Sequence, residues 1–220
     1  MAAKFWFIRH GESISNANLP TTHPAATELT PRGEQEAEHI ALAFREAPGL
    51  IVVSPFARAR QTAAPTINRF PHVPVAEWPV HEFTWLHPAR YKGWTTLDRE
   101  PYSRAYWQRN DPWEQEMGGG ESFAAFWQRV LAIRQRLQTH DVPFTAVFSH
   151  NFFLRGLLYT LLTGEEEVTP DLMRRFRLVM RGIEMPNGAI WEVTVADDGR
   201  ITFTGFHSDH MPEILGVYHY

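Results

Sequence analysis

The chain has 220 residues, of which 44% are hydrophobic, and it contains no cysteine. A chain of this size can bury one large core, and the missing cysteines exclude disulfide bonds, thiol catalysis and cysteine-ligated zinc. Its net charge of −4 argues against a general binder of nucleic acids or acidic membranes. The apolar runs at 5–8 and 152–162 are too short for a secretory signal or a membrane span. We therefore expect a cytoplasmic protein with no nucleic-acid or membrane partner, while its oligomeric state stays open.

The first third of the chain alternates between patterns typical of strands and of helices. Short continuous apolar runs predict buried strands, and apolar residues that recur every three or four positions predict helices. Thr30-Pro31 is a helix start, with threonine as N-cap and proline at the first helical position. In chain order the pattern predicts a strand at 5–8, a helix from Pro31 that ends near Pro48-Gly49, a strand at 50–53, a helix at 57–69 that is kinked or broken at Pro65, and a weaker strand at 73–77.

The rest of the chain begins with a long segment that has no clear period. Residues 82–120 are rich in aromatic and charged side chains, and three glycines close the segment. We interpret residues 83–120 as a lid inserted into the main domain. Beyond the lid, the pattern predicts a helix capped by Ser122, a strand at 145–148, a helix at 152–162 with Gly164 as its C-cap, a helix from Thr169-Pro170 to about Gly182, and an antiparallel hairpin of strands at 189–195 and 201–206.

Alternating strands and helices predict an α/β fold. We expect a three-layer α/β/α sandwich with a mostly parallel central sheet, an antiparallel C-terminal strand pair and the lid insertion, all within a single domain over 1–220. In such sheets, ligands bind outside the carboxyl ends of the strands. Two histidines and two arginines are therefore expected at one edge of the sheet. The residues that follow three of the predicted strands are Arg9-His10, Ser54 with the nearby Arg58, and Ser149-His150.

Arginine and histidine together suit the binding and transfer of a phosphoryl group. The guanidinium of arginine is planar, stays charged and donates paired hydrogen bonds. A neutral imidazole is a nucleophile near pH 7, and a protonated one donates to phosphate. The leaving alkoxide also needs a proton, which a carboxyl group of raised pKa can give and afterwards take from water. Glu82, at the start of the lid, is the candidate for this role, and Glu77 is its main rival.

Five short segments add a signal through their order along the chain. They are Arg9-His10-Gly11-Glu12-Ser13 with Asn16 following, Leu29-Thr30-Pro31-Arg32-Gly33-Glu34-Gln35-Glu36-Ala37, Ser54-Pro55 with Arg58-Ala59 and Gln61-Thr62-Ala63, Gly119-Gly120-Glu121-Ser122, and Ser149-His150. Any one of them is common by chance, but the ordered set, which extends to about Arg155, is specific. It resembles the motifs of the histidine phosphatase superfamily, also called the phosphoglycerate-mutase-like family.

The resemblance implies a role for each candidate residue. His10 would be the nucleophile and would carry a phosphohistidine intermediate. Glu82 would act as general acid and then as general base. No metal or cofactor would be needed, and the partner would be a small phosphorylated substrate. The phosphate would be clamped by Arg9, Arg58 and His150, with help from Asn16 in the first loop.

Two asparagines and one histidine pair leave alternatives open. The family usually has glycine after its second catalytic histidine, whereas this chain has Asn151, which either contacts phosphate or substrate or caps the next helix. Asn16 either contacts phosphate or is a simple turn residue. His207 and His210 resemble half of a metal site, but nothing nearby in the sequence completes a ligand set, and we expect no metal there.

Phosphatases and mutases share this catalytic core. The glycolytic mutases resemble one another in a long insertion with paired arginines that hold a substrate carboxylate. Residues 82–120 contain no adjacent arginine pair, and the single such pair in the chain is Arg174-Arg175. We therefore predict a phosphatase that hydrolyses a small phosphomonoester. A phosphoglycerate-type mutase and a catalytically weak, phosphate-binding regulatory protein are the alternatives. The sequence does not name the substrate, and we expect residues 84–118 to set specificity.

Overall fold

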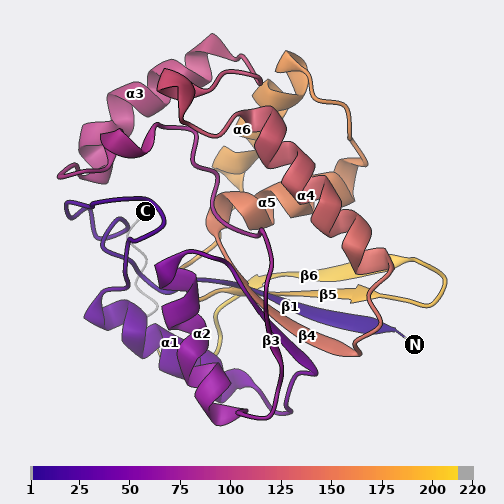
Figure 1. Cartoon of the computed structure of the whole chain (residues 1–220). Coiled ribbons are helices and arrows are strands. Elements are labelled where there is room, and N and C mark those ends of the chain that lie inside the picture. Colours follow the sequence, from indigo (N-terminus) through magenta and orange to yellow (C-terminus); the bar gives the residue numbers. More distant parts are fainter. Residues whose placement is uncertain (1, 213–220) are drawn as a thin grey trace.

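The computed structural model describes residues 2–212, and within them a six-stranded sheet lies between two helical layers (Figure 1). In space the strands follow the order β3-β2-β4-β1-β5-β6. The first two predicted strands, each of which precedes a helix, lie on either side of β4 in the sheet. The strands are β1 (Ala3–Arg9), β2 (Leu50–Val53), β3 (Val75–Glu77), β4 (Phe144–Ser149), β5 (Ile190–Val195) and β6 (Ile201–His207).

The sheet is parallel on one side and antiparallel on the other. β4 lies between β1 and β2 and is parallel to both, and β2 is parallel to β3. β5 is antiparallel to β1, and β6 is antiparallel to β5. The predicted fold class, including the antiparallel C-terminal pair, is therefore confirmed.

The two helical layers cover opposite faces of the sheet. α1 and α2 pack on one face, and α4, α5 and α6 pack on the other (Figure 1). None of the helices in the described residues is both long enough and apolar enough to span a bilayer. The helices are α1 (Pro31–Ala43), α2 (Ala57–Arg69), α3 (Thr96–Arg109), α4 (Phe123–Gln138), α5 (Asn151–Thr163) and α6 (Pro170–Gly182).

The central strand β1 supplies apolar side chains to both layers. Phe5 and Phe7 belong to the core under α4, α5 and α6, whereas Ile8 belongs to the core under α1 and α2, against which Trp6 packs. Successive side chains of a strand point to opposite faces, so a strand covered on both faces must be apolar at every position. This explains why the first predicted strand shows a continuous apolar run rather than an alternating pattern.

Capping side chains set the helix boundaries where the sequence predicts them. The hydroxyl groups of Thr30, Ser122 and Thr169 each accept a hydrogen bond from the first turn of α1, α4 and α6. Gly164 ends α5 in the left-handed conformation, at φ 71°. Two predictions need correction. α1 ends at Ala43, before Pro48-Gly49, and α2 runs unbroken through Pro65.

The segment 83–120, which we interpret from its sequence as a lid, contains a helix that the sequence pattern does not reveal. α3 spans 14 residues, begins with a capping box between Thr95 and Asp98, and ends at Asn110 in the left-handed conformation. It buries Arg99, Tyr106 and Trp107 alone among its residues, so it lacks the apolar stripe that marks an amphipathic helix. This explains why the segment 82–120 reads as aperiodic.

Candidate active site

The register of β1 and β4 brings the two candidate histidines together. Arg9 is the register partner of Ser149, so His10 and His150 follow neighbouring strands at the same edge of the sheet. The backbone N–H of His10 donates to the carbonyl of Ser149 over 3.0 Å. The two imidazole rings lie with their centroids 5.0 Å apart, and both are buried. The two histidines therefore lie together at one edge of the sheet, as the sequence predicts.

His10 is held as a neutral imidazole by hydrogen bonds at both ring nitrogens. Its Nε2 lies 3.0 Å from Nε of Arg58, and its Nδ1 lies 2.7 Å from the carbonyl oxygen of Gly11. Because the guanidinium can only donate, Nε2 accepts and Nδ1 carries the proton. Burial, followed by the charges of Arg58 and Arg9, lowers the pKa of His10 well below 6.5. Nε2 thus carries no proton, and it can attack phosphorus once the N–H of Arg58 turns to a phosphate oxygen.

The two arginines whose charges act on His10 come from different elements. Arg58 lies in the first turn of α2, is buried, and also donates to the carbonyl of Pro24 over 2.8 Å. Arg9 is the last residue of β1 and donates to the carbonyl of Met185. Its Nε is buried and has no hydrogen-bond partner among the described residues. Burial lowers the pKa of both guanidinium groups to about 10, so both stay charged at neutral pH.

His150 is the N-cap residue of α5 and is fully buried. Its Nε2 lies 2.8 Å from the hydroxyl of Ser54, which follows β2. Its Nδ1 is buried without a hydrogen-bond partner in the part of the chain that the structure describes. Burial, and then the charge of Arg58, lowers its pKa well below 6.5. Arg9 and His150 thus each keep a buried nitrogen without a partner among the described residues, which suits a site where a ligand completes the hydrogen bonds.

Glu82 is enclosed near Arg58 and Arg9, whereas its rival Glu77, the last residue of β3, is exposed. Its Oε1 accepts hydrogen bonds from the backbone N–H of Phe152, over 2.9 Å, and of Phe83, over 3.2 Å. Burial raises the pKa of Glu82, although Arg58 and Arg9 act against this. Glu77, by contrast, is exposed and forms an ion pair with Arg60 on the surface. The structure therefore favours Glu82 as the carboxyl group of raised pKa beside the two arginines.

The first loop and the start of α1 are packed tightly behind His10. A Cβ on Gly33 would lie 2.0 Å from the carbonyl oxygen of Glu12, and one on Gly11 would lie 2.5 Å from the carbonyl oxygen of Gly33. Glycine is therefore required where these backbones meet. Glu36, buried in α1, accepts from the backbone N–H of Glu12 over 2.6 Å and from Arg32 over 3.1 Å. The motif around Thr30 thus fixes the loop that carries His10.

Asn16 lies in this loop as a turn residue. Its Oδ1 accepts from the backbone N–H and the hydroxyl of Ser13, over 3.1 and 2.8 Å. It also accepts over 3.2 Å from Asn187, whose side chain donates over 3.1 Å to the carbonyl of His10. A chain of hydrogen bonds therefore links Asn16 to the backbone of His10. Its role in phosphate binding stays a prediction.

Asn151 does not cap α5. His150 occupies the N-cap position, and Oδ1 of Asn151 is buried without a hydrogen-bond partner among the described residues. A capping side chain would accept a hydrogen bond from the first turn, so the capping interpretation is wrong. The alternative, that Asn151 contacts phosphate or substrate, stays a prediction.

The structure adds Arg155 and Tyr91 to the surroundings of the site. Arg155 of α5 interacts electrostatically with Glu82 and Arg9, and it donates to the carbonyl of Met180 over 3.0 Å. Tyr91, in the lid, lies under the guanidinium of Arg99, and burial raises the pKa of Tyr91. Arg155 had a visible signal in the sequence, as the single charge in the apolar run 152–162. Tyr91 had none, because the lid contains many aromatic residues.

His207 and His210, for which we expect no metal from the sequence, lie at the end of β6 and just beyond it. Nε2 of His207 lies 3.6 Å from Glu192, and Nε2 of His210 lies 3.1 Å from the carbonyl oxygen of Gly188. No group of three or more histidine, aspartate or glutamate side chains arranged to hold a metal ion is found between residues 2 and 212.

A three-layer α/β fold that gathers a neutral histidine, two arginines, a second histidine and a carboxyl group of raised pKa suits phosphoryl transfer. Comparison with known proteins identifies the class. Residues 5–201 match the family described as "Histidine phosphatase superfamily (branch 1)". The chain belongs to this superfamily and is a phosphatase, a phosphoric monoester hydrolase.

Individual relatives agree with this assignment. The adenosylcobalamin/alpha-ribazole phosphatase of Salmonella typhimurium is 30% identical over 173 residues, which cover 73% of this chain and 80% of the relative. The crystal structure of the alpha-ribazole phosphatase from Shigella flexneri superposes with a TM-score of 0.71 at 22% identity, over 93% of this chain and 96% of that chain. A phosphoserine phosphatase from Entamoeba histolytica, in complex with 3-phosphoglyceric acid, gives 0.68 at 20% identity, over 94% and 98%. At these identities, the two structures show the fold.

Proposed function

We propose that the protein hydrolyses a small phosphomonoester through a phosphohistidine intermediate on His10. The geometry of His10 carries this proposal. Its Nε2 lone pair faces Arg58 at 3.0 Å, while its Nδ1 proton is held by the carbonyl of Gly11 at 2.7 Å. This arrangement supplies a neutral nucleophile directly beside a cation that can hold the phosphate it attacks.

In the first step, Nε2 of His10 attacks phosphorus and the bond from phosphorus to the ester oxygen breaks. Arg9, Arg58 and the second histidine, His150, hold the phosphoryl oxygens and stabilise the charge that gathers on them. The protonated carboxyl group of Glu82 gives its proton to the leaving oxygen, so the alcohol departs neutral. The products of this step are the free alcohol, phospho-His10 and ionised Glu82.

In the second step, water attacks the phosphohistidine. Glu82, now ionised, accepts a proton from this water, and the bond between phosphorus and Nε2 breaks. Inorganic phosphate leaves, while neutral His10 and protonated Glu82 are restored. The raised pKa of Glu82 suits both roles, because it favours the acid form that gives the proton and makes the ionised form a stronger base.

We further propose that residues 1–220 act as one catalytic domain and that the lid at 83–120 selects the alcohol part of the substrate. Tyr91 of the lid interacts electrostatically with Arg58 and Glu82, which supports a position of the lid over the site. The absence of cysteine suits a reducing compartment, and we propose the cytoplasm. The names of the relatives make alpha-ribazole phosphate and phosphoserine the first substrates to compare.

Trapping the intermediate tests the proposal. The enzyme is mixed with a phosphomonoester labelled in its phosphate, denatured in alkali, and digested for mass spectrometry. We expect acid-labile, alkali-stable phosphate on His10, and none in His10→Asn. The exposed His72 serves as a matched control, because His72→Asn should retain the label on His10.

Three results would contradict the proposal. Label that persists in His10→Asn would exclude this nucleophile. Transfer of the label to a second hydroxyl of the substrate, in place of release as inorganic phosphate, would favour the mutase. A lack of turnover on a broad panel of phosphoesters would favour a phosphate-binding regulator.

A further inference from the structure

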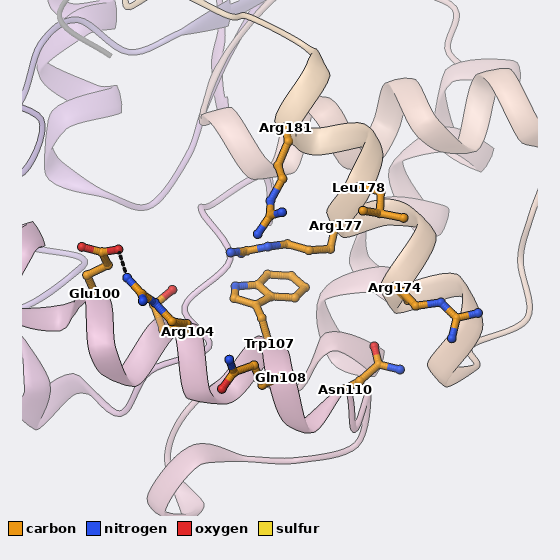
Figure 2. Close-up of a pocket in the computed structure, with 10 residues that line it drawn as sticks. Glu100, Arg104, Trp107, Gln108, Asn110, Arg174, Arg177, Leu178 and Arg181 are labelled. Carbon is orange, nitrogen blue, oxygen red and sulfur yellow. Dashed lines mark hydrogen bonds and ion pairs between the residues drawn. The ribbon is translucent and has the colours of Figure 1, made fainter.

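A cavity lies on the outer side of the helical layer, between α3 of the lid and α6 (Figure 2). Its volume is about 730 Å³, which falls within the range of small-molecule sites in proteins. The two helices are joined at one end, where the side chain of Asn110 donates to the carbonyl of Pro170 over 2.9 Å. None of the residues assigned to the proposed reaction lines this cavity.

Two arginines on α6 face into the cavity. Arg177 and Arg181 are one helical turn apart, so they lie on the same face of the helix. The guanidinium of Arg177 lies over the ring of Trp107, with its central carbon 4.5 Å from the ring centroid. Figure 2 shows the guanidinium of Arg181 pointing toward that of Arg177 from the side away from the indole of Trp107.

These two arginines lack acidic partners within residues 2–212. Neither forms an ion pair with an aspartate or glutamate there, and the charge of Arg181 adds to burial in lowering the pKa of Arg177. The nearby Arg104 and Arg174 differ, because each is paired with a carboxylate of its own helix. Two like charges are thus held together over an aromatic floor, in a chain whose net charge is −4.

We propose that the cavity between α3 and α6 is a second anion site, which binds the phosphate group of a small molecule apart from the catalytic pocket. The guanidinium forks of Arg177 and Arg181 supply paired hydrogen bonds and opposite charge. Trp107 fixes the position of one fork, and Leu178, with 59% of its surface exposed, offers an apolar contact beside it. This site goes beyond the proposed hydrolysis and does not depend on it.

The phosphate group can come from two sources. The cavity lies near the active site, because Trp107, which lines the cavity, contacts Phe152, which is hydrogen-bonded to Glu82. The ring of Trp107 stacks on that of Phe152 at a centroid distance of 6.1 Å, and the backbone N–H of Phe152 donates to Glu82. The group is either a separate phosphate compound or the distal phosphate of a bisphosphorylated substrate. Both sources require the same two arginines.

Calorimetric titration with inorganic phosphate at low salt tests the site. The full chain is titrated directly, because a phosphate analogue that blocked the catalytic pocket would also fill the second site. We expect two phosphates to bind, one in the catalytic pocket and an additional one in the cavity between α3 and α6. Arg177→Ser and Arg181→Ser should each weaken binding of the additional phosphate about tenfold or more, as expected for the loss of charged hydrogen bonds.

Arg175→Ser is the matched control. It removes the same charge from the same helix, but Arg175 pairs with Glu165 and does not line the cavity. We expect it to change phosphate binding less than twofold. Arg181 is exposed and makes no packing contact like that of Arg177 on Trp107, so Arg181→Ser tests the site even if Arg177→Ser alters the fold. Absence of the additional phosphate, or equal weakening in Arg175→Ser and Arg181→Ser, overturns the proposal.

Kinetics then separate the two sources. The KM values of a bisphosphorylated sugar and of p-nitrophenyl phosphate are compared between the natural chain and Arg181→Ser. A rise of about tenfold for the bisphosphate alone supports the distal phosphate of the substrate as the ligand. If Arg181→Ser leaves the KM of each compound unchanged but loses the phosphate binding seen by calorimetry, the ligand is a separate phosphate compound.

Discussion

Glu82 is the residue from which the pH dependence of the proposed reaction follows. Its carboxyl group has a raised pKa, because burial outweighs the attraction of Arg58 and Arg9. The acid form is needed for the first step, so the fraction of active enzyme falls as the pH rises through this pKa. A second buried carboxyl group, Glu36, also has a raised pKa, but it binds the backbone of Glu12 behind the pocket. Burial by itself therefore does not identify the acid.

Replacement of Glu82 tests this assignment. We expect Glu82→Gln to lower kcat about 10²- to 10⁴-fold on alkyl phosphates, because the amide gives no proton to the leaving oxygen. The loss on p-nitrophenyl phosphate should be smaller, since its leaving group needs little protonation. Profiles of kcat/KM against pH, measured on both substrates, should also lose their alkaline limb.

Glu77→Gln is the control for this change. Glu77 pairs with Arg60 on the surface, so its loss should leave both profiles as they are. An alkaline limb that persists in Glu82→Gln and disappears in Glu77→Gln would reverse the assignment.

At the scale of elements, the lid is tied to the first loop through Arg99 of α3. This buried guanidinium donates to the hydroxyls of Thr21 and Ser15, over 3.0 and 2.9 Å, and to the carbonyl of Trp94 over 2.8 Å. Backbone hydrogen bonds connect Thr21 with Gly93 and Trp94. Because the first loop also carries His10, the same contacts position the lid relative to His10.

We expect Arg99→Ala to loosen this connection. Hydrogen bonds to a charged group contribute about 1.5–3 kcal/mol each, so the amide of Gly93 should exchange its hydrogen about tenfold faster or more. KM should rise with it, because substrate must then order the lid on binding. Hydrogen exchange by mass spectrometry and steady-state kinetics measure the two effects.

Arg109→Ala provides a comparison on the same helix. Arg109 pairs with Glu114 at the exposed end of α3, away from the first loop, and we expect it to affect neither measurement. Unchanged exchange at Gly93 in Arg99→Ala would show that other contacts hold the lid.

At the scale of the whole molecule, buried histidines make stability depend on pH. Burial is the first cause of a lowered pKa at His10, His81, His140, His150 and His210, and it lowers the values of His81 and His210 to about 4. In the unfolded chain these groups take up protons near their ordinary value of about 6.5. The unfolded state therefore binds more protons below pH 6.5, and the free energy of unfolding falls as the pH falls through this value.

The melting temperature should accordingly be lower at pH 5.5 than at pH 7.5. Each histidine contributes at most about 1.4 kcal/mol per pH unit in this window, and the raised pKa values of Glu36 and Glu82 oppose the effect. Scanning calorimetry at both pH values measures the difference. His210→Asn, which lies outside the active site, should reduce it. An equal or higher melting temperature at pH 5.5 would contradict the expectation.

The sequence by itself determined the features that depend on local chemistry. Capping hydroxyls at Thr30, Ser122 and Thr169 marked helix starts, because a side chain that accepts from the first turn needs no distant partner. Continuous apolar runs marked the central strands, and the ordered motifs placed Arg9-His10 and Ser149-His150 at one edge of the sheet. The fold class and the family followed from these signals.

Other features were decided only by the tertiary structure, because they depend on burial and on contacts between distant segments. Glu82 was distinguished from Glu77 by its enclosure near Arg9 and Arg58. The capping interpretation of Asn151 failed because His150 takes the N-cap position, and α3 was missed because its contacts lie in the lid and the first loop. The tautomer of His10 likewise required Arg58, 48 residues away, to lie 3.0 Å from its ring. A local pattern records what a residue can do, whereas packing decides which of its neighbours are present and how much water is excluded.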